Sequence, residues 1–180
     1  GEHAHLAVKR AHPAERLCTA VPPRAFLLAE AIAVRRGDHE RQRRDRVITG
    51  HLRAALPDLA GRHIGFYWPF KGEYDPRLLV RALHAQGARL ALPVVVRRAA
   101  PMAFRPWRPG TRLVPGIWDI PVPAEGDPVL PDTLLVPLVG FDPRGYRLGH
   151  GGGYYDRTLA AMPHRPRAIG IGEQRHALAG

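Results

Sequence analysis

Apolar positions at helical spacing mark an amphipathic helix in the first third of the chain. Over residues 47–56 the apolar side chains recur every three or four residues, opposite a face that carries several arginines. Asp38 can cap the start of this helix, and Pro57 follows its end. The pattern predicts a helix that begins near Asp38, preceded by another helix within residues 24–37.

Compact apolar runs predict buried strands along the rest of the chain. They span residues 63–70, 89–96, 132–141 and 167–172. Between the first two lies "DPRLLVRALHAQG", which predicts a helix with Pro76 in its first turn and Gly87 at its end. A strand, a helix and a strand joined by short connections form a βαβ unit, which implies parallel strands.

Two further segments complete the predicted fold. "PMAFRPW" (101–107) is expected to form a short edge strand, because Pro106 would interrupt a central ladder. Residues 154–162 are expected to form a helix before the last strand. Together the elements predict an α/β fold with a mostly parallel sheet flanked by helices on both faces.

Length and composition favour one domain. Residues 1–23 have no clear period and are expected to form a loosely ordered arm, and residues 24–180 the single α/β domain. Cys18 is the only cysteine, so no internal disulfide is possible. The apolar stretch 25–34 is too short to span a bilayer, and Glu30 interrupts it. We therefore expect a cytoplasmic monomer that does not enter a membrane.

The charge balance is strongly basic. The chain has 27 lysine and arginine residues against 16 acidic ones, a net charge of +11. Such a surface attracts polyanions: nucleic acid, anionic lipid, or phosphorylated and polycarboxylate metabolites. Lys9 and Lys71 are the only lysines, and arginine forks suit carboxylate and phosphate. An arginine bias can equally reflect the base composition of a genome, so charge alone selects no ligand.

Two segments lie where an open α/β sheet binds its ligands, beyond the carboxyl ends of strands. The first is "FKGEYDP" (70–76), and the second is "RLGHGGGYYDR" (147–157). In the second, glycines allow backbone N–H groups to approach oxygens closely, and the following helix adds a favourable dipole. Arg147 and Arg157 can neutralise negative charge, and Asp156 can hold Mg²⁺ through oxygen.

A plain structural interpretation of this glycine segment stays open. It can be a tight strand-to-helix turn in which Asp156 serves only as a capping acid. The segment has no lysine for a Walker loop, and Tyr154 stands where a dinucleotide-binding fingerprint needs its last glycine. The ten histidines show no paired spacing typical of a metal site.

The glycine segment "GYRLGHGGGYYDR" after "VPLVGFD" closely resembles the signature of the 5-formyltetrahydrofolate cyclo-ligase family. Other segments are similar to this family in the same order: "IGFYWPFKGEYDPR", "PVVVRRAAPMAFRPW" followed by "GIWDIP", and "AIGIGEQ". The resemblance covers about residues 60 to 175.

The resemblance implies an ATP- and Mg²⁺-dependent enzyme. ATP would phosphorylate the formyl oxygen of 5-formyltetrahydrofolate, N10 would attack the activated carbon, and ring closure would release phosphate beside ADP. The product would be 5,10-methenyltetrahydrofolate. Phosphoryl transfer of this kind requires positioning and charge neutralisation more than a covalent nucleophile.

The resemblance also implies a role for individual residues. Arg147 would offset developing charge, and Asp156 would be catalytic and hold Mg²⁺. Glu73 would accept hydrogen bonds from the pterin, with Tyr67 and Tyr154 as further substrate contacts and Phe66 and Trp107 as aromatic neighbours of the ring. The ATP phosphates would be cradled by Gly149, His150, Gly151, Gly152, Gly153, Tyr154 and Tyr155. The substrate's glutamate tail would suit the basic surface.

Two departures from the family pattern leave alternatives open. The usual N-terminal lysine and arginine have only Arg24, Lys9 and Arg10 as candidates, and no His-Asp pair follows Gln174. A relative that binds nucleotide or folate without turnover is therefore one alternative. A basic nucleic-acid-binding module is another, although the chain contains no recognised nucleic-acid motif and no aromatics among its basic run.

Overall fold

A five-stranded sheet forms the centre of the molecule. The computed structural model describes residues 38–70, 72–138, 140–141, 147–148 and 152–171. The strand order is β3-β2-β1-β6-β9, with every neighbouring pair parallel except β2 and β3, so that β3 is an antiparallel edge. The strands are β1 (His63–Gly65), β2 (Arg89–Val94), β3 (Ala103–Trp107), β6 (Thr133–Pro137) and β9 (Arg167–Ile171). The predicted mostly parallel sheet and the edge strand at Pro106 are confirmed.

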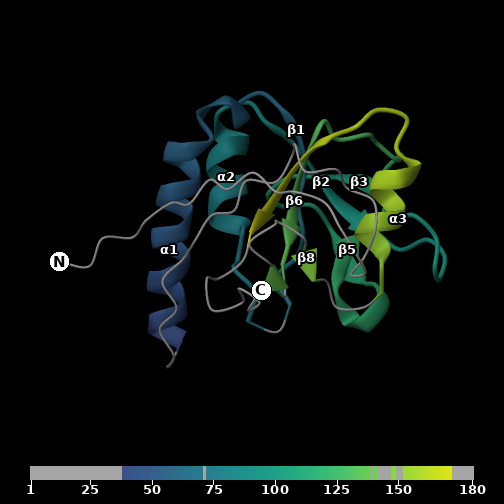
Figure 1. The fold of residues 1–180 in the computed structure, drawn as a ribbon, viewed down its shortest axis with the longest axis horizontal. Coiled ribbons are helices and arrows are strands. Elements are labelled where there is room, and N and C mark those ends of the chain that lie inside the picture. Colours follow the sequence, from purple (N-terminus) through teal and green to yellow (C-terminus); the bar gives the residue numbers. More distant parts are fainter. Residues whose placement is uncertain (1–37, 71, 139, 142–146, 149–151, 172–180) are drawn as a thin grey trace.

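Helices cover both faces of this sheet, as predicted. Helices α1 (Asp38–Ala55) and α2 (Arg77–Ala85) lie on one face, and α3 (Tyr154–Ala161) lies on the other (Figure 1). The βαβ unit predicted around α2 is present, because β1 and β2 are parallel and α2 connects them. The helix predicted within residues 24–37 and the arm at residues 1–23 lie outside the described residues.

Each face has its own apolar core. On the first, side chains of α1 and α2 such as Ile48, Leu52 and Leu79 are packed with Ile64 and Leu135 of the sheet, all at most 1% exposed. Burial of each such side chain contributes roughly 2 kcal/mol. On the second, a smaller cluster packs against α3 through Tyr155, Leu159 and Met162. The apolar side chains that repeat along the sequence are therefore the ones that fill the two cores.

The strands are shorter than the apolar runs that predicted them. The run 63–70 forms only three residues of β1, and one further ladder bond joins Phe66 N–H to the Ala91 carbonyl at 3.0 Å. No residue from Phe66 to Phe70 belongs to a strand, and Pro69 has no N–H with which to continue the ladder. Hydrophobicity was therefore a poor guide to strand length.

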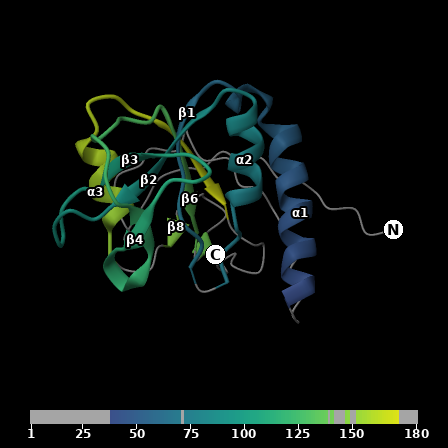
Figure 2. The same ribbon diagram turned by 180° about the vertical axis from the view of Figure 1, so that it is seen from behind.

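The run 132–141 also divides into two elements. It forms β6 and then β7 (Gly140–Phe141), which pairs with β8 (Arg147–Leu148) in a separate two-stranded sheet. A second small hairpin, β4 (Leu113–Pro115) and β5 (Pro121–Pro123), was not predicted, because its three-residue strands are too short to show a period. In both views this hairpin lies beside the lower end of α3 (Figures 1 and 2).

None of the described helices is long and apolar enough to span a membrane.

Candidate functional site

The two segments singled out in the sequence follow adjacent parallel strands. Strand β1 ends at Gly65 and β6 at Pro137, and Gly65 pairs with Leu134 across the ladder. Parallel strands end at the same edge of a sheet, so the chain leaves β1 and β6 at the same edge, and the second segment then begins with β8. Burial raises the pKa of Tyr67, and the charges of Glu73, Tyr74 and Tyr155 raise it further.

The first segment folds into a tight turn around Glu73, which we call the glutamate turn (residues 70 and 72–73). Glu73 N–H donates to the Phe70 carbonyl at 3.2 Å, and Phe70 N–H donates to Glu73 Oε2 at 2.9 Å. Gly72 has a φ of 82°, a conformation that glycine adopts without steric cost. Burial raises the pKa of Glu73 to about 7, and the hydrogen bond from Phe70 opposes part of that rise. The carboxyl group can therefore change charge near neutral pH.

A buried hydrogen-bond chain joins the residues on either side of the glutamate turn to α1. Tyr67 is only 3% exposed, and its hydroxyl donates to the Tyr74 carbonyl at 3.0 Å. Thr49 Oγ1 lies 2.7 Å from the Asp45 carbonyl and 2.7 Å from Tyr74 Oη. Since the threonine proton goes to that carbonyl, Tyr74 donates to Thr49. The Tyr67 side chain is thus almost completely buried. Its predicted contact with a substrate stays a prediction.

Arg44 of α1 lies behind the glutamate turn. Its guanidinium donates to Asp45 Oδ1 at 2.9 and 3.0 Å, and Nη2 lies 3.5 Å from the carbonyl oxygens of Gly72 and Glu73. The Arg44 side chain is 8% exposed. Burial raises the pKa of Asp45, while Arg44 opposes the rise. The cation behind this turn is thus neutralised by its own carboxylate.

The second segment presents backbone donors, and we call its described residues Gly152–Tyr154 the glycine turn. Gly153 is the N-cap of α3 with φ 62° and ψ 16°, and Tyr154 is the first helical residue. Within the described part of the chain, the N–H groups of Gly152, Gly153 and Tyr154 have no hydrogen-bond acceptor. A left-handed glycine at a helix start directs successive N–H groups to one concave side, which is an anion-binding arrangement.

Aromatic and cationic side chains surround the glycine turn. The Arg157 guanidinium donates to the Gly152 carbonyl and lies 5.0 Å from the centre of the Tyr154 ring. Trp118 meets the same ring edge to face, with centroids 6.1 Å apart. Trp118 lies in the turn Ile117–Asp119 between β4 and β5, with a φ of 54°, and is 63% exposed. This exposed aromatic is therefore held beside the start of α3 by a left-handed backbone.

The remaining predicted site residues are only partly described. Arg147 belongs to β8, where it pairs with Phe141 of β7, and Asp156 lies in the first turn of α3. Gly149, His150 and Gly151 lie outside the described residues. No group of three His, Cys, Asp or Glu side chains that could hold a metal ion occurs in the described ranges. A Mg²⁺ ion here would therefore depend on Asp156 together with oxygens of a bound phosphate and water.

The structure does not favour the two aromatic neighbours expected beside the ligand ring. Phe66 and Trp107 are 0% and 6% exposed and pack edge to face, with centroids 5.1 Å apart. They belong to the core, as Tyr67 does, and this structure does not expose them to a ligand ring. Trp118, by contrast, is exposed beside Tyr154. The sequence signal for it is weak, since only Gly116 two positions earlier suggests a turn.

Comparison with known proteins now decides the family. Residues 22–175 match the 5-formyltetrahydrofolate cyclo-ligase family. The chain belongs to this family. It is 34% identical over 120 residues to the 5-formyltetrahydrofolate cyclo-ligase of Haemophilus influenzae, covering 62% of this chain and 63% of that one. It is 37% identical over 114 residues to the enzyme of the same name from Escherichia coli, with 60% and 63% covered. The chain thus spans less than two thirds of the length of these relatives.

Solved structures agree with the family assignment. The Aquifex aeolicus 5,10-methenyltetrahydrofolate synthetase superposes with a TM-score of 0.66 at 29% identity, covering 79% of this chain and 72% of that one. The synthetase from Mycoplasma pneumoniae gives a TM-score of 0.62 at 26% identity, with 81% and 80% covered. The α/β architecture of the cyclo-ligase family is therefore the architecture of this chain.

Proposed function

We propose that this chain converts 5-formyltetrahydrofolate to 5,10-methenyltetrahydrofolate with ATP. The observation that carries the proposal is the glycine turn, whose N–H groups at Gly152, Gly153 and Tyr154 have no acceptor in the described structure. Such donors at a helix N-terminus are suited to phosphate oxygens. The proposal agrees with the family of the chain and with the names of its relatives.

Each turn is proposed to bind a different substrate. The glycine turn offers donors to the ATP phosphates, and Glu73 offers an acceptor to the N–H groups of the pterin. Asp156 and the phosphate oxygens would hold Mg²⁺, which supplies charge neutralisation at the phosphoryl group. Arg147, from β8, is proposed to offset the charge that develops during transfer.

The chemistry then proceeds by two displacements. The formyl oxygen attacks the γ-phosphorus, and ADP leaves with the electron pair of the broken P–O bond. N10 attacks the formyl carbon, gives up its proton, and the C–O bond breaks to release phosphate. The residues of the chain hold the reacting groups together and offset charge, which is what such a transfer requires. We further propose that the protein acts as a cytoplasmic monomer.

An absorbance assay tests the proposal directly. The purified chain is mixed with 5-formyltetrahydrofolate and Mg-ATP, and the near-ultraviolet absorbance of the methenyl product is followed together with ADP release. We expect one ADP for each product molecule and no product when ATP is omitted or Mg²⁺ is chelated. No absorbance rise at high enzyme concentration, with no ADP formed, would reject catalysis. Calorimetric binding of ATP or folate without product would instead favour the non-catalytic relative.

A further inference from the structure

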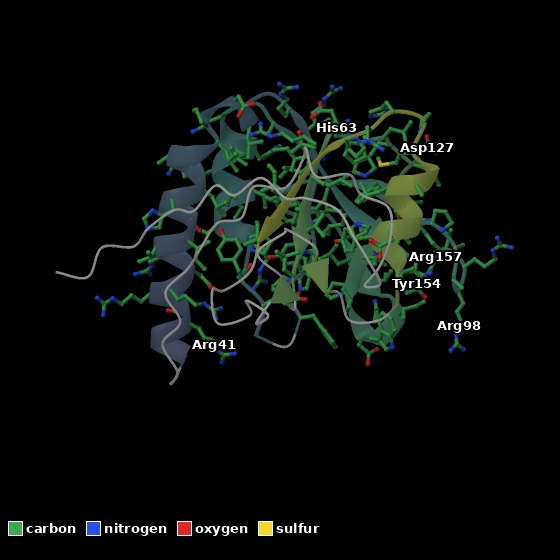
Figure 3. The ribbon with its side chains drawn as sticks, in the orientation of Figure 1. Arg41, His63, Arg98, Asp127, Tyr154 and Arg157 are labelled. Atoms are coloured by element: carbon green, nitrogen blue, oxygen red, sulfur yellow. The ribbon has the colours of Figure 1, made fainter. Side chains whose placement is uncertain are left out.

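Arg157 is the fourth residue of α3, but its guanidinium group contacts residues at and before the start of that helix. It donates to the Gly152 carbonyl and lies over the Tyr154 ring. Figure 3 shows Arg157 and Tyr154 as neighbours on α3, on the side of the molecule opposite α1. Arg157 therefore contacts both residues that flank Gly153.

The guanidinium charge of Arg157 is not neutralised by a carboxylate of the described residues, and it lies at a helix end that disfavours positive charge. No carboxylate in the described part of the chain pairs with Arg157, and its Nε is buried without an acceptor. The N-terminal end of a helix carries partial positive charge and disfavours a cation. An anion bound at the same end would offset both charges. The charge pattern thus points to a negatively charged ligand beside this turn.

The hydrogen bond to Gly152 also sets the direction of a backbone donor. The carbonyl of Gly152 and the N–H of Gly153 belong to one peptide group, which is trans like the other described peptides. In a trans peptide the C=O and N–H point in opposite directions. Because Arg157 holds the carbonyl, the Gly153 N–H is directed away from Arg157, and it has no acceptor in the described structure.

A side chain at either glycine of this peptide would have to displace Arg157 or Tyr154. A Cβ at Gly153 would lie 2.9 Å from Arg157 Nη1, and a Cβ at Gly152 would lie 2.9 Å from Tyr154 Cδ2. The Tyr154 ring also meets Trp118 edge to face. Tyr154 thus contacts both Trp118 and Arg157, and the peptide of Gly152 and Gly153 lies against Arg157 and Tyr154.

We infer that Arg157 is a positioning residue, which orients the Gly152–Gly153 peptide so that the Gly153 N–H meets an oxyanion of the ligand. The identity of that ligand, a nucleotide phosphate, rests on the proposed function. The orientation itself rests on the contacts of Arg157 with Gly152 and Tyr154.

The orientation can be tested without any ligand. Amide NMR signals of Gly152 and Gly153 are compared between the ¹⁵N-labelled wild type and Arg157→Ala, with Arg98→Ala as the matched control. Arg98 is exposed, and its loss removes the same charge. We expect both glycine signals to shift in Arg157→Ala and to stay in place in Arg98→Ala. Unchanged glycine signals in Arg157→Ala would overturn the inference.

The consequence for a ligand is measured with Mg-ATP. Calorimetry and steady-state kinetics are expected to show Kd and KM for Mg-ATP raised about tenfold in Arg157→Ala, equivalent to about 1.4 kcal/mol, with kcat changed less than about twofold. Arg157→Lys keeps the charge and one donor, so it should recover part of the affinity, and it replaces the alanine variant if that does not fold. A Kd and KM equal to those of Arg98→Ala would overturn the inference.

The outcomes separate this inference from the proposed function. If the wild type binds Mg-ATP but forms no methenyl product, the proposed catalysis fails, and the Kd series still decides the role of Arg157. If the wild type does not bind Mg-ATP, the nucleotide part of the inference is overturned together with the proposed function. The glycine signals then decide only whether Arg157 orients the peptide.

Discussion

The glutamate turn comes after β1, the glycine turn comes after β8 and leads into α3, and an arginine side chain lies against the backbone of each turn. Arg44 lies 3.5 Å from backbone carbonyls of the glutamate turn, and Arg157 donates to a backbone carbonyl of the glycine turn. The two arginines differ in whether a carboxylate neutralises the guanidinium charge. Arg44 has Asp45 at 2.9 Å, whereas Arg157 has an aromatic ring and no carboxylate in the described structure.

This difference separates a structural arginine from one placed for a ligand. The neutralised Arg44 belongs to the packing between α1 and the turn, and the group that remains to face a ligand there is the Glu73 acceptor. At the glycine turn the donors and the cation are both uncompensated within the described residues. One turn is therefore suited to N–H groups and the other to oxyanions.

The strongest test of this division removes the charged groups assigned to phosphoryl transfer. Arg147→Ala and Asp156→Ala should each lower kcat by roughly 100-fold, because charge stabilisation of the transferred group is lost. Glu73→Ala should instead act mainly on the KM for folate. Steady-state kinetics with each substrate varied in turn makes the distinction. Small and equal effects of all three variants would contradict the assigned roles.

A methyl group at the glycine turn should have the next largest effect. In Gly153→Ala the new Cβ meets Arg157 Nη1 at 2.9 Å, and φ of 62° strains a non-glycine residue. We expect the KM for Mg-ATP to rise about tenfold or more, with the KM for folate little changed. The matched control is Gly50→Ala in α1, where nothing lies within 4 Å. It should raise stability by about 1 kcal/mol and leave both KM values alone.

The pKa of Glu73 gives a pH test of the glutamate turn. Its pKa is about 7, and the ionised form is the better acceptor for pterin N–H groups. The kcat/KM for folate should therefore rise about tenfold between pH 6 and 8, as ionisation proceeds. In Glu73→Gln this dependence should disappear. A wild type and variant with the same pH profile would remove Glu73 from folate recognition.

The same pKa predicts a dependence of stability on pH. Because the folded-state pKa is raised from 4.5 to about 7, the folded state keeps a proton that the unfolded chain has already released. The contribution of Glu73 to the free energy of unfolding is complete below pH 4.5 and is lost as pH rises through about 7. Denaturant titrations of the wild type and Glu73→Gln, compared across this range, measure it.

The smallest effect on activity is expected at Arg44. Arg44→Met leaves the half-buried Asp45 without its partner, so the free energy of unfolding should fall by about 2 kcal/mol. The KM for Mg-ATP should stay at the wild-type value, because the glycine turn does not depend on α1. Arg157→Ala should show the reverse pattern, with affinity lost and the midpoint of thermal unfolding nearly kept. Matching behaviour of the two variants would remove the distinction between the turns.

The sequence determined the layers of the fold and the positions of both turns. Residues 47–56 have helical spacing, and apolar runs mark β1, β2, β6 and β9. Both are local patterns that can be read without knowing the tertiary contacts. The two turns were predicted from their place after buried strands. The resemblance of "GYRLGHGGGYYDR" to the cyclo-ligase family predicted the family that the comparisons then established.

Only the tertiary structure decided where strands end and which aromatics face a ligand. Phe66 and Trp107 lie in the core, while Trp118 is exposed in a hairpin too short to have a period. The sequence alone does not distinguish Arg44 from Arg157, because both belong to a chain rich in arginine. Compensation of a charge depends on which carboxylate lies within a few ångströms, and that distance is a property of the folded chain.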